Sequence, residues 1–235
     1  MMTRGIISIY WGDESKLPID RLTSSVKKYH PELPHEIIKV DASAQDFKSL
    51  NQKARMLDLS PFDETLFLDI DTVVMGKLDF GFEKARIHGL ALSICECPWG
   101  KRYPKLFTGD EIEYNTGVIF FTKQARSVFE SWNSLASTID SSISFVKDGK
   151  PATMSANDQG SFALAIEQTT FNPYVLPLNW NFRPIWHKSY FGPLKVWHDY
   201  ANPPDWVEKI NSYYASKEAI IQYHPLANPF KTAKA

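Results

Sequence analysis

The sequence predicts an α/β fold with a mostly parallel central sheet. Short apolar runs alternate with stretches of helical periodicity from residue 6 onward, a pattern typical of β-α-β units. The run Leu66-Phe67-Leu68 is apolar at successive positions, as expected for a strand covered on both faces of a parallel sheet. At 235 residues, with no repeat, low-complexity block or linker, the chain suits one α/β domain.

The first part of the chain is the most regular. A right-handed β-α-β opening is predicted from a strand, a helix and a strand at residues 6–10, 17–28 and 36–40. Residues 46–59 have helical spacing, and Ser60-Pro61 ends that helix before the strand that leads to two acids. Later strands are predicted at residues 90–96, 118–121, 175–178 and 220–224, with helices at 124–137 and 158–167.

Composition excludes several classes of partner. The formal net charge of −1 gives neither a basic nucleic-acid face nor a polybasic membrane tether. The apolar run at residues 6–10 is too short for a signal sequence or a membrane span, so a cytoplasmic location without a membrane span is expected. Cys95 and Cys97 are interpreted as reduced packing residues, because their spacing does not suit a zinc knuckle.

The acids Asp69 and Asp71 follow the buried strand directly. Side chains two residues apart in a strand point the same way, so these two carboxylates should converge. Converging carboxylates repel each other unless a cation lies between them, and hard oxygen ligands suit Mn2+ or Mg2+. The alternative is that Asp69 caps the strand and Asp71 begins an ordinary turn.

Tyr10-Trp11-Gly12 lies where the first strand ends. Ligands of open α/β sheets bind at the carboxyl ends of the strands, so an aromatic ring there could stack on a nucleobase, or it could simply pack.

Further segments extend the pattern: Asn115-Thr116-Gly117-Val118 opens an apolar strand, and Asn157-Asp158-Gln159 opens a helix. With these, the chain resembles the GT-A glycosyltransferases, and specifically family eight, the glycogenin and lipopolysaccharide galactosyltransferase group. The resemblance covers almost the whole chain. Six features of that family have counterparts in the same order, at Arg55, Asp69 with Asp71, Asn115 with Gly117, Asp158 with Gln159, Asn179 with Asn181, and His224.

The resemblance implies a single GT-A domain, of Rossmann-like architecture, that transfers a hexose from a nucleotide-diphosphate sugar, with a UDP-sugar favoured. Residues 1–75 would bind nucleotide and metal, and residues 76–235 would bind the sugar and the acceptor. The acceptor would be a hydroxyl of a glycan, a lipid-linked compound or a protein. The implied cofactor is Mn2+ (or Mg2+), held by Asp69, Asp71 and His224.

Further roles come from the same resemblance. The donor would be bound by Arg55, Asn115, Asn179 and Lys231, together with Tyr10 and Trp11, which are predicted from their place at the end of the first strand. Lys53 could replace Arg55 if the helical register differs by half a turn. Lys231 stands in Pro229-Phe230-Lys231, where the family has Lys-Pro-Trp, and Ala227 replaces a family glycine.

Asp158 and Gln159 are the implied catalytic residues. Asp158 would bind hydroxyls of the transferred sugar, and Gln159 would lie beneath the anomeric carbon. Because a neutral amide is a poor covalent nucleophile, retention through same-face attack is favoured, with the leaving diphosphate deprotonating the acceptor.

Other readings remain open at this point. An inverting GT-A enzyme would use a carboxylate base such as Asp158. A phosphatase of the haloacid dehalogenase type would use Asp69 as a nucleophile. A sugar-binding domain without activity would need neither a catalytic base nor a nucleophile. The aromatic residues between positions 178 and 206 could form an acceptor wall or belong to the core.

Overall fold

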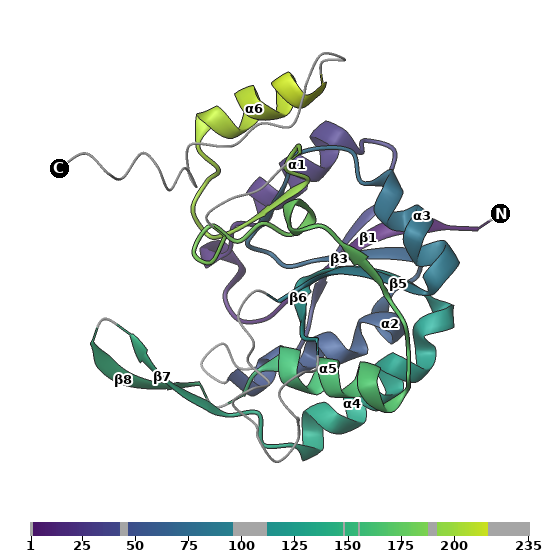
Figure 1. The fold of residues 1–235 in the computed structure, drawn as a ribbon, viewed down its shortest axis with the longest axis vertical. Helices are drawn as coiled ribbons and strands as arrows, with labels where there is room; N and C mark the ends of the chain where they lie inside the picture. The colour runs from purple at the N-terminus through teal and green to yellow at the C-terminus, as the bar shows by residue number, and fades with distance from the viewer. Residues whose placement is uncertain are drawn as a thin grey trace.

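The computed structural model describes residues 2–42, 47–95, 112–147, 149–154, 156–187 and 192–215. Its centre is a six-stranded sheet in the order β2-β1-β3-β6-β5-β9 (Figure 1). The strands are β1 (Arg4–Tyr10), β2 (His35–Lys39), β3 (Glu64–Leu68), β5 (Leu90–Ile94), β6 (Tyr114–Thr122) and β9 (Tyr174–Leu176). β6 runs antiparallel to β3 and β5, and the other strands share one direction. The predicted mostly parallel sheet is confirmed.

Helices cover both faces of the sheet, which explains why every residue of β3 and β6 is buried. One face packs against α1 (Ile19–Tyr29) and α3 (Asp79–His88). The other face packs against α2 (Met56–Leu59), α4 (Arg126–Thr138) and α5 (Asp158–Gln168). Successive apolar residues of β3 and β6 therefore enter alternate hydrophobic cores.

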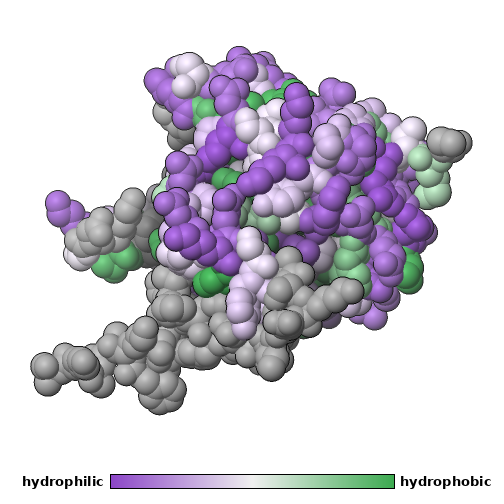
Figure 2. Space-filling model, turned by 90° about the horizontal axis from the view of Figure 1, so that it is seen from above, coloured by the Kyte–Doolittle hydropathy of each residue, from purple (hydrophilic) through white to green (hydrophobic). Residues whose placement is uncertain are grey.

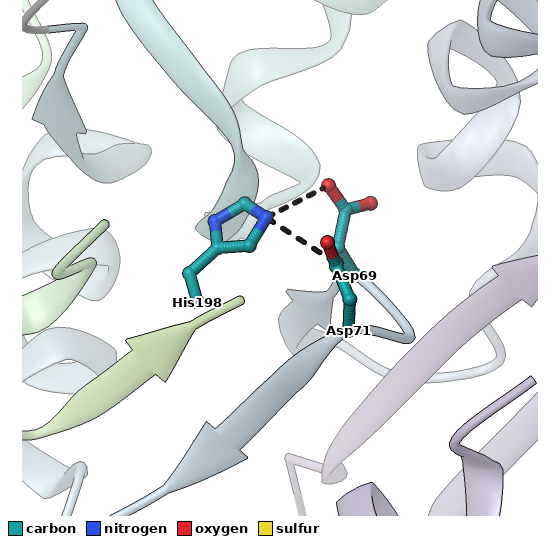
Figure 3. Close-up of side chains that lie close together, drawn as sticks. All are labelled: Asp69, Asp71 and His198. Carbon is teal, nitrogen blue, oxygen red and sulfur yellow. Dashed lines mark ion pairs between the residues drawn. The ribbon is translucent and has the colours of Figure 1, made fainter. Parts of the chain in front are cut away.

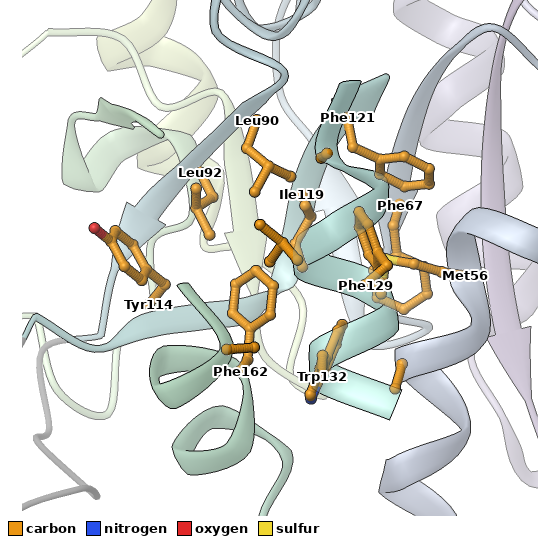
Figure 4. Close-up of a cluster of buried hydrophobic side chains, with 14 of the residues drawn as sticks. Met56, Phe67, Leu90, Leu92, Tyr114, Ile119, Phe121, Phe129, Trp132 and Phe162 are labelled. Carbon is orange, nitrogen blue, oxygen red and sulfur yellow. The ribbon is translucent and has the colours of Figure 1, made fainter. Parts of the chain in front are cut away.

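The core beneath α4 and α5 is dominated by aromatic rings (Figure 4). Trp132 of α4 and Phe162 of α5 are completely buried, and their ring centroids lie 4.5 Å apart. The indole Nε1 of Trp132 donates a 3.0 Å hydrogen bond to Ser161 Oγ, so the polar edge of the ring is also satisfied. This packing fixes α5 against the sheet and thereby fixes its first residues, Asp158 and Gln159.

Two smaller sheets complete the fold. β4 (Thr72–Val74) pairs antiparallel with β10 (Val196–His198), and β7 (Ile143–Lys147) with β8 (Lys150–Met154) forms a hairpin that projects from the body (Figure 1). Short 3-10 helices lie at Glu14–Lys16, Lys123–Ala125 and Leu178–Trp180, and α6 (Asp205–Ala215) follows β10. The sequence analysis did not predict α3, the hairpin, β10 or α6, and the strand predicted at residues 220–224 lies outside the described residues.

The helix predicted at residues 46–59 has a different geometry. Phe47–Arg55 is a 3-10 helix, followed by the four residues of α2. A 3-10 helix repeats every three residues, so Leu50, Lys53 and Met56 share one face, whereas α-helical spacing would pair Asn51 with Arg55. Lys53 and Met56 are accordingly buried, and Arg55 is exposed.

Candidate active site

The two acids lie on a turn at the carboxyl end of β3. The strand ends at Leu68, and Thr72 closes the turn by donating its backbone N–H (3.1 Å) and its hydroxyl (2.7 Å) to the carbonyl of Asp69. The backbone N–H of Asp69 donates to the carbonyl of Gly117 on β6 (2.9 Å). Asp69 and Asp71 therefore converge because the chain turns back, not because of the strand alternation from which their convergence was predicted.

A histidine from a distant strand completes this cluster. β10 pairs with β4 so that His198 lies opposite Thr72, next to the turn. The imidazole Nε2 of His198 lies 3.3 Å from Asp71 Oδ1 and 3.7 Å from Asp69 Oδ2 (Figure 3). One ligand atom from each of the three residues lies within 4.8 Å of the others. His198 was not predicted, and His224, the expected third ligand, lies outside the described residues.

Lys53 supplies the positive charge beside the acids. Its ammonium Nζ lies 2.8 Å from both carboxylate oxygens of Asp69 and 3.2 Å from Asp158 Oδ2, and its side chain is 8% exposed. Arg55, which was predicted to bind the donor, is exposed, and its guanidinium donates to Gln52 Oε1 (3.0 Å). The structure therefore brings the alternative, Lys53, to the acids and leaves Arg55 on the surface.

The protonation of this cluster reflects burial and mutual charge. Burial raises the pKa of Asp69, as does the charge of Asp71, although Lys53 opposes both. Burial would also raise the pKa of Asp71, but the contacts with His198, together with the charge of Lys53, outweigh burial and lower that pKa to about 2. Burial would lower the pKa of Lys53, yet Asp158 and Asp69 raise it. Three carboxyl groups lie around one ammonium here, and a divalent cation beside Asp69 and Asp71 would offset the repulsion between these two.

Asp158 and Gln159 begin α5 beside this cluster. Asn157 caps the helix, because its Oδ1 accepts from the backbone N–H of Gln159 (2.9 Å). Asp158 Oδ2 accepts a 2.6 Å hydrogen bond from the hydroxyl of Thr116 and also contacts Lys53. Gln159 Oε1 accepts from the side-chain amide of Asn115 (2.9 Å). Thr116 and Asn115 of β6 thus position the two predicted catalytic residues through side-chain hydrogen bonds.

The two asparagines of the 178–181 segment have different surroundings. Asn181 is 1% exposed and donates to Asn115 Oδ1 (2.7 Å), so its side chain belongs to the cluster. Asn179 donates to the carbonyl of Pro193 (2.6 Å). The structure therefore joins Asn181, not Asn179, to the other predicted site residues.

A cavity of about 320 Å³ opens beside the acids. Its lining combines aromatic, apolar and charged residues, namely Ile9, Tyr10, Trp11, Leu17, Leu50, Lys53, Asp69, Ile70, Asp71 and Tyr200. Tyr10 is buried and donates its hydroxyl to Glu14 Oε2 (2.5 Å). Trp11 is partly buried, and both predicted aromatic residues therefore border the cavity that contains the acids. Lys231 lies outside the described residues.

The loop after His198 is fixed against the acid turn by Arg21 of α1. The guanidinium donates to the backbone carbonyls of Asp71 (3.0 Å), Asp199 (2.7 Å) and Tyr200 (2.6 Å). Tyr200 is 70% exposed and lies at the rim of the cavity. Of the other aromatic residues proposed for an acceptor wall, Trp180, Phe182 and Trp197 are buried in the core, and Trp186 is exposed.

Comparisons with known proteins identify the fold. No family model and no curated protein sequence matches the chain. Among solved structures, mouse xyloside xylosyltransferase 1 matches with a TM-score of 0.55 and 14% identity, over 86% of this chain and 99% of that one. The galactosyltransferase LgtC, in complex with donor and acceptor sugar analogues, matches with a TM-score of 0.55 and 15% identity, over 92% and 97% of the two chains. The chain has the GT-A fold.

The GT-A fold confirms the structural part of the predicted resemblance. A second LgtC structure, an active-site mutant in which glutamate replaces a glutamine, matches with a TM-score of 0.55 and 14% identity, over 90% of this chain and 95% of that one. In this chain's GT-A fold, the acid turn, Lys53 and the start of α5 lie together at the carboxyl end of β3. Within the described residues, no helix is both long and apolar enough to cross a membrane.

Proposed function

We propose that this protein is a metal-dependent hexosyltransferase. It would transfer a hexose from a nucleotide-diphosphate sugar, with UDP as the favoured nucleotide, to a hydroxyl of a glycan, a lipid-linked compound or a protein. The observation that carries the proposal is the convergence of Asp69, Asp71 and His198 beside a cavity lined by Trp11 and Lys53. The GT-A fold and the sugar analogues held by LgtC support it.

The cluster of Asp69, Asp71 and His198 fits a divalent cation. It offers carboxylate oxygens and an imidazole nitrogen, a donor set that suits Mn2+ and accommodates Mg2+ less well. A bound cation would act as a Lewis acid that neutralises the diphosphate as the glycosidic bond breaks. His198 takes the place first given to His224 in this proposal. The site draws two ligands from the part expected to bind nucleotide, residues 1–75, and one from residues 76–235.

The surroundings of Asp158 and Gln159 support retention of configuration. Asp158 is 4% exposed, and its Oδ2 already contacts Thr116 and Lys53, which makes it a poor general base for inversion. Gln159 is a neutral amide whose oxygen accepts from Asn115, so its NH2 group is the part left to interact with substrate. A route in which the leaving phosphate deprotonates the acceptor hydroxyl requires neither a base nor a nucleophile from the chain.

The remaining residues of the site have supporting roles in this proposal. Lys53 holds Asp69 and Asp158 in place through its buried ammonium. Trp11 and Tyr10 border the cavity where a nucleobase could stack. The phosphatase alternative finds no support in the fold, because Asp69 follows the third strand of a GT-A sheet.

The proposal is tested by nucleotide-dependent thermal stability. The wild-type protein and Asp71→Asn are unfolded with UDP, GDP, CDP or ADP, each with and without Mn2+. A ligand at ~100 times its dissociation constant stabilises a protein by about 2.7 kcal/mol. We expect stabilisation of the wild type by UDP only when Mn2+ is present, and none of Asp71→Asn.

Asp58→Asn is the matched control, because the side chain of Asp58 is 74% exposed. It should respond to UDP and Mn2+ as the wild type does. Equal stabilisation of Asp71→Asn would contradict the metal assignment, and no response to any nucleotide would favour a domain without transferase activity. NMR of the product then decides between retention and inversion from the configuration at the anomeric carbon.

A further inference from the structure

A chain of buried amides connects β6 to His198. The backbone N–H of Gly117 donates to Asn115 Oδ1 (3.0 Å), and Asn181 Nδ2 donates to the same oxygen (2.7 Å). Asn181 Oδ1 then lies 2.8 Å from His198 Nδ1. We refer to Gly117, Asn115, Asn181 and His198 as the amide relay. Asn115 is 5% exposed and Asn181 is 1% exposed, so water cannot replace these hydrogen bonds freely.

The backbone N–H of Gly117 determines the orientation of both side-chain amides in the amide relay and the tautomer of His198. A backbone N–H can only donate, so the Asn115 atom that faces Gly117 must be the amide oxygen. Because that oxygen accepts, the Asn181 atom facing it must be the NH2 group. The opposite atom of Asn181, which faces the imidazole, is therefore its oxygen. An amide oxygen only accepts, so His198 Nδ1 must carry a hydrogen.

We propose that Asn181 is a positioning residue that holds His198 in the Nδ1–H tautomer and so leaves Nε2 free to bind the divalent cation. The inference rests on the metal site of the proposed function, and it adds a residue that does not contact the cation itself. His198 Nε2 is the ring nitrogen that faces Asp69 and Asp71. A histidine that binds a metal almost always donates its other ring N–H to an acceptor, and that acceptor fixes both tautomer and ring orientation.

The amide relay is needed because Asp71 favours the Nε2–H tautomer of His198, which cannot bind a cation through Nε2. Asp71 Oδ1, 3.3 Å from Nε2, would accept a hydrogen bond from an Nε2–H group, and an imidazole with that hydrogen cannot bind a metal through Nε2. The oxygen of Asn181 opposes this by accepting from Nδ1 at the shorter distance of 2.8 Å. Without Asn181, the neutral ring should place its hydrogen on Nε2.

The first test determines which ring nitrogen of His198 carries the hydrogen. Long-range proton–nitrogen NMR of the ¹⁵N-labelled, metal-free protein is recorded above the usual range of imidazole titration, and the His198 signals are assigned by their loss in His198→Gln. We expect the Nδ1–H tautomer in the wild type and the Nε2–H tautomer in Asn181→Leu. Asn181→Asp keeps an acceptor for Nδ1–H and should keep the wild-type tautomer.

The second test measures Mn2+ affinity by electron paramagnetic resonance on the same proteins. Loss of a residue that orients a metal ligand typically weakens binding about 10–100-fold. We expect a rise of that size in the dissociation constant for Asn181→Leu and a change of no more than a few-fold for Asn181→Asp. Asn211→Leu is the structural control, because Asn211 also bonds two buried carbonyls, those of Met75 and Leu194, without contacting His198.

The two readouts separate the ways in which the inference can fail. If His198 in Asn181→Leu keeps its hydrogen on Nδ1, Asn181 does not position the ring, and the proposed function stands without it. If the tautomer changes but Mn2+ affinity does not, His198 is not a ligand, and the metal site itself is wrong. Should Asn181→Leu not fold, Asn181→Ala removes the same acceptor with a smaller side chain, and a single Nδ1–H tautomer in that variant would overturn the inference.

Discussion

The side-chain NH2 group is the part of Gln159 that can donate hydrogen bonds to a substrate in the site. Its backbone N–H is held by Asn157, and its side-chain oxygen is held by Asn115. These two contacts fix the side chain at the first turn of α5, and they make it a hydrogen-bond donor toward any bound substrate. In the proposed reaction, this NH2 group would donate a hydrogen bond to an oxygen of the transferred hexose.

Gln159→Ala should therefore slow transfer and leave nucleotide binding intact. The variant removes a contact to the reacting sugar but none to Asp69 or Asp71. Turnover is measured with the donor identified by thermal stability, and UDP binding with Mn2+ is measured in parallel. A loss of UDP binding as large as that of Asp71→Asn would show that Gln159 is misplaced in the proposed mechanism.

His35 gives the stability a dependence on pH that is unconnected with the site. Burial lowers the pKa of this imidazole from 6.5 to about 4, and Nε2 lies 3.0 Å from the hydroxyl of the fully buried Ser8. The unfolded chain binds a proton near pH 6.5, whereas the folded chain does so only near pH 4. The stabilising contribution is thus complete above the unfolded pKa and is lost as the pH falls through this window.

The melting temperature of the wild type should consequently fall more steeply between those pH values than that of His35→Gln. Thermal unfolding of both proteins, without metal or nucleotide, measures the difference. Parallel curves would show that the His35 ring is accessible to protons in the folded state.

At the scale of secondary structure, close approach between β6 and β10 shapes the site. Gly117 faces His198, and a Cβ built at Gly117 would clash with the imidazole ring and lie 2.8 Å from Asp69 Oδ2. The absence of a side chain at this one position allows the histidine to reach the acids. The same residue donates the hydrogen bond that orients the amide relay.

Gly117→Ala should displace His198 and weaken Mn2+ binding by about tenfold or more, because three atoms of the cluster cannot keep their places. Gly76→Ala is the control, since the nearest atom to its Cβ would be Lys195 Cδ at an ordinary 3.5 Å. Isothermal titration with Mn2+ compares the two variants. Equal affinities would mean that the ring adapts to the methyl group.

The sequence predicted elements where periodicity was strong and missed those that depend on distant partners. β1, β3, α1 and α5 have clear apolar patterns and were predicted. β10 has three residues and exists because it pairs with β4, so nothing local indicated it or its His198. α3 was missed because its apolar residues lie on several sides, with Phe82 buried and Ile87 61% exposed.

For the whole molecule, the core beneath α4 and α5 does more than stabilise the fold. Trp132 joins α4 to α5 through Phe162 and Ser161, and α5 carries Asp158 and Gln159. The antiparallel direction of β6, which the apolar pattern does not reveal, places Asn115 and Thr116 next to that helix. The site residues of β6 and those of α5 therefore come together only when the complete sheet has formed.

Trp132→Ala should destabilise the protein by about 3–5 kcal/mol, the usual cost of emptying a large aromatic site in a core. Trp186→Ala is the matched control, because Trp186 is 41% exposed and its removal should change stability by about 0.5 kcal/mol or less. Urea unfolding measures both. A small effect of Trp132→Ala would show that the neighbouring helices close the cavity by shifting.

The pairing of β4 with β10 also sets the order in which the site can form during synthesis. Asp69 and Asp71 leave the ribosome long before His198, and Arg21 can bind the carbonyls of Asp199 and Tyr200 only after that loop has emerged. A nascent chain that ends before β10 has Asp69, Asp71 and Lys53 but lacks His198, the third member of the cluster. If the proposed metal site is correct, high cation affinity would become available only to a chain that has closed this long-range contact, and a bound cation would then favour the completed fold by mass action.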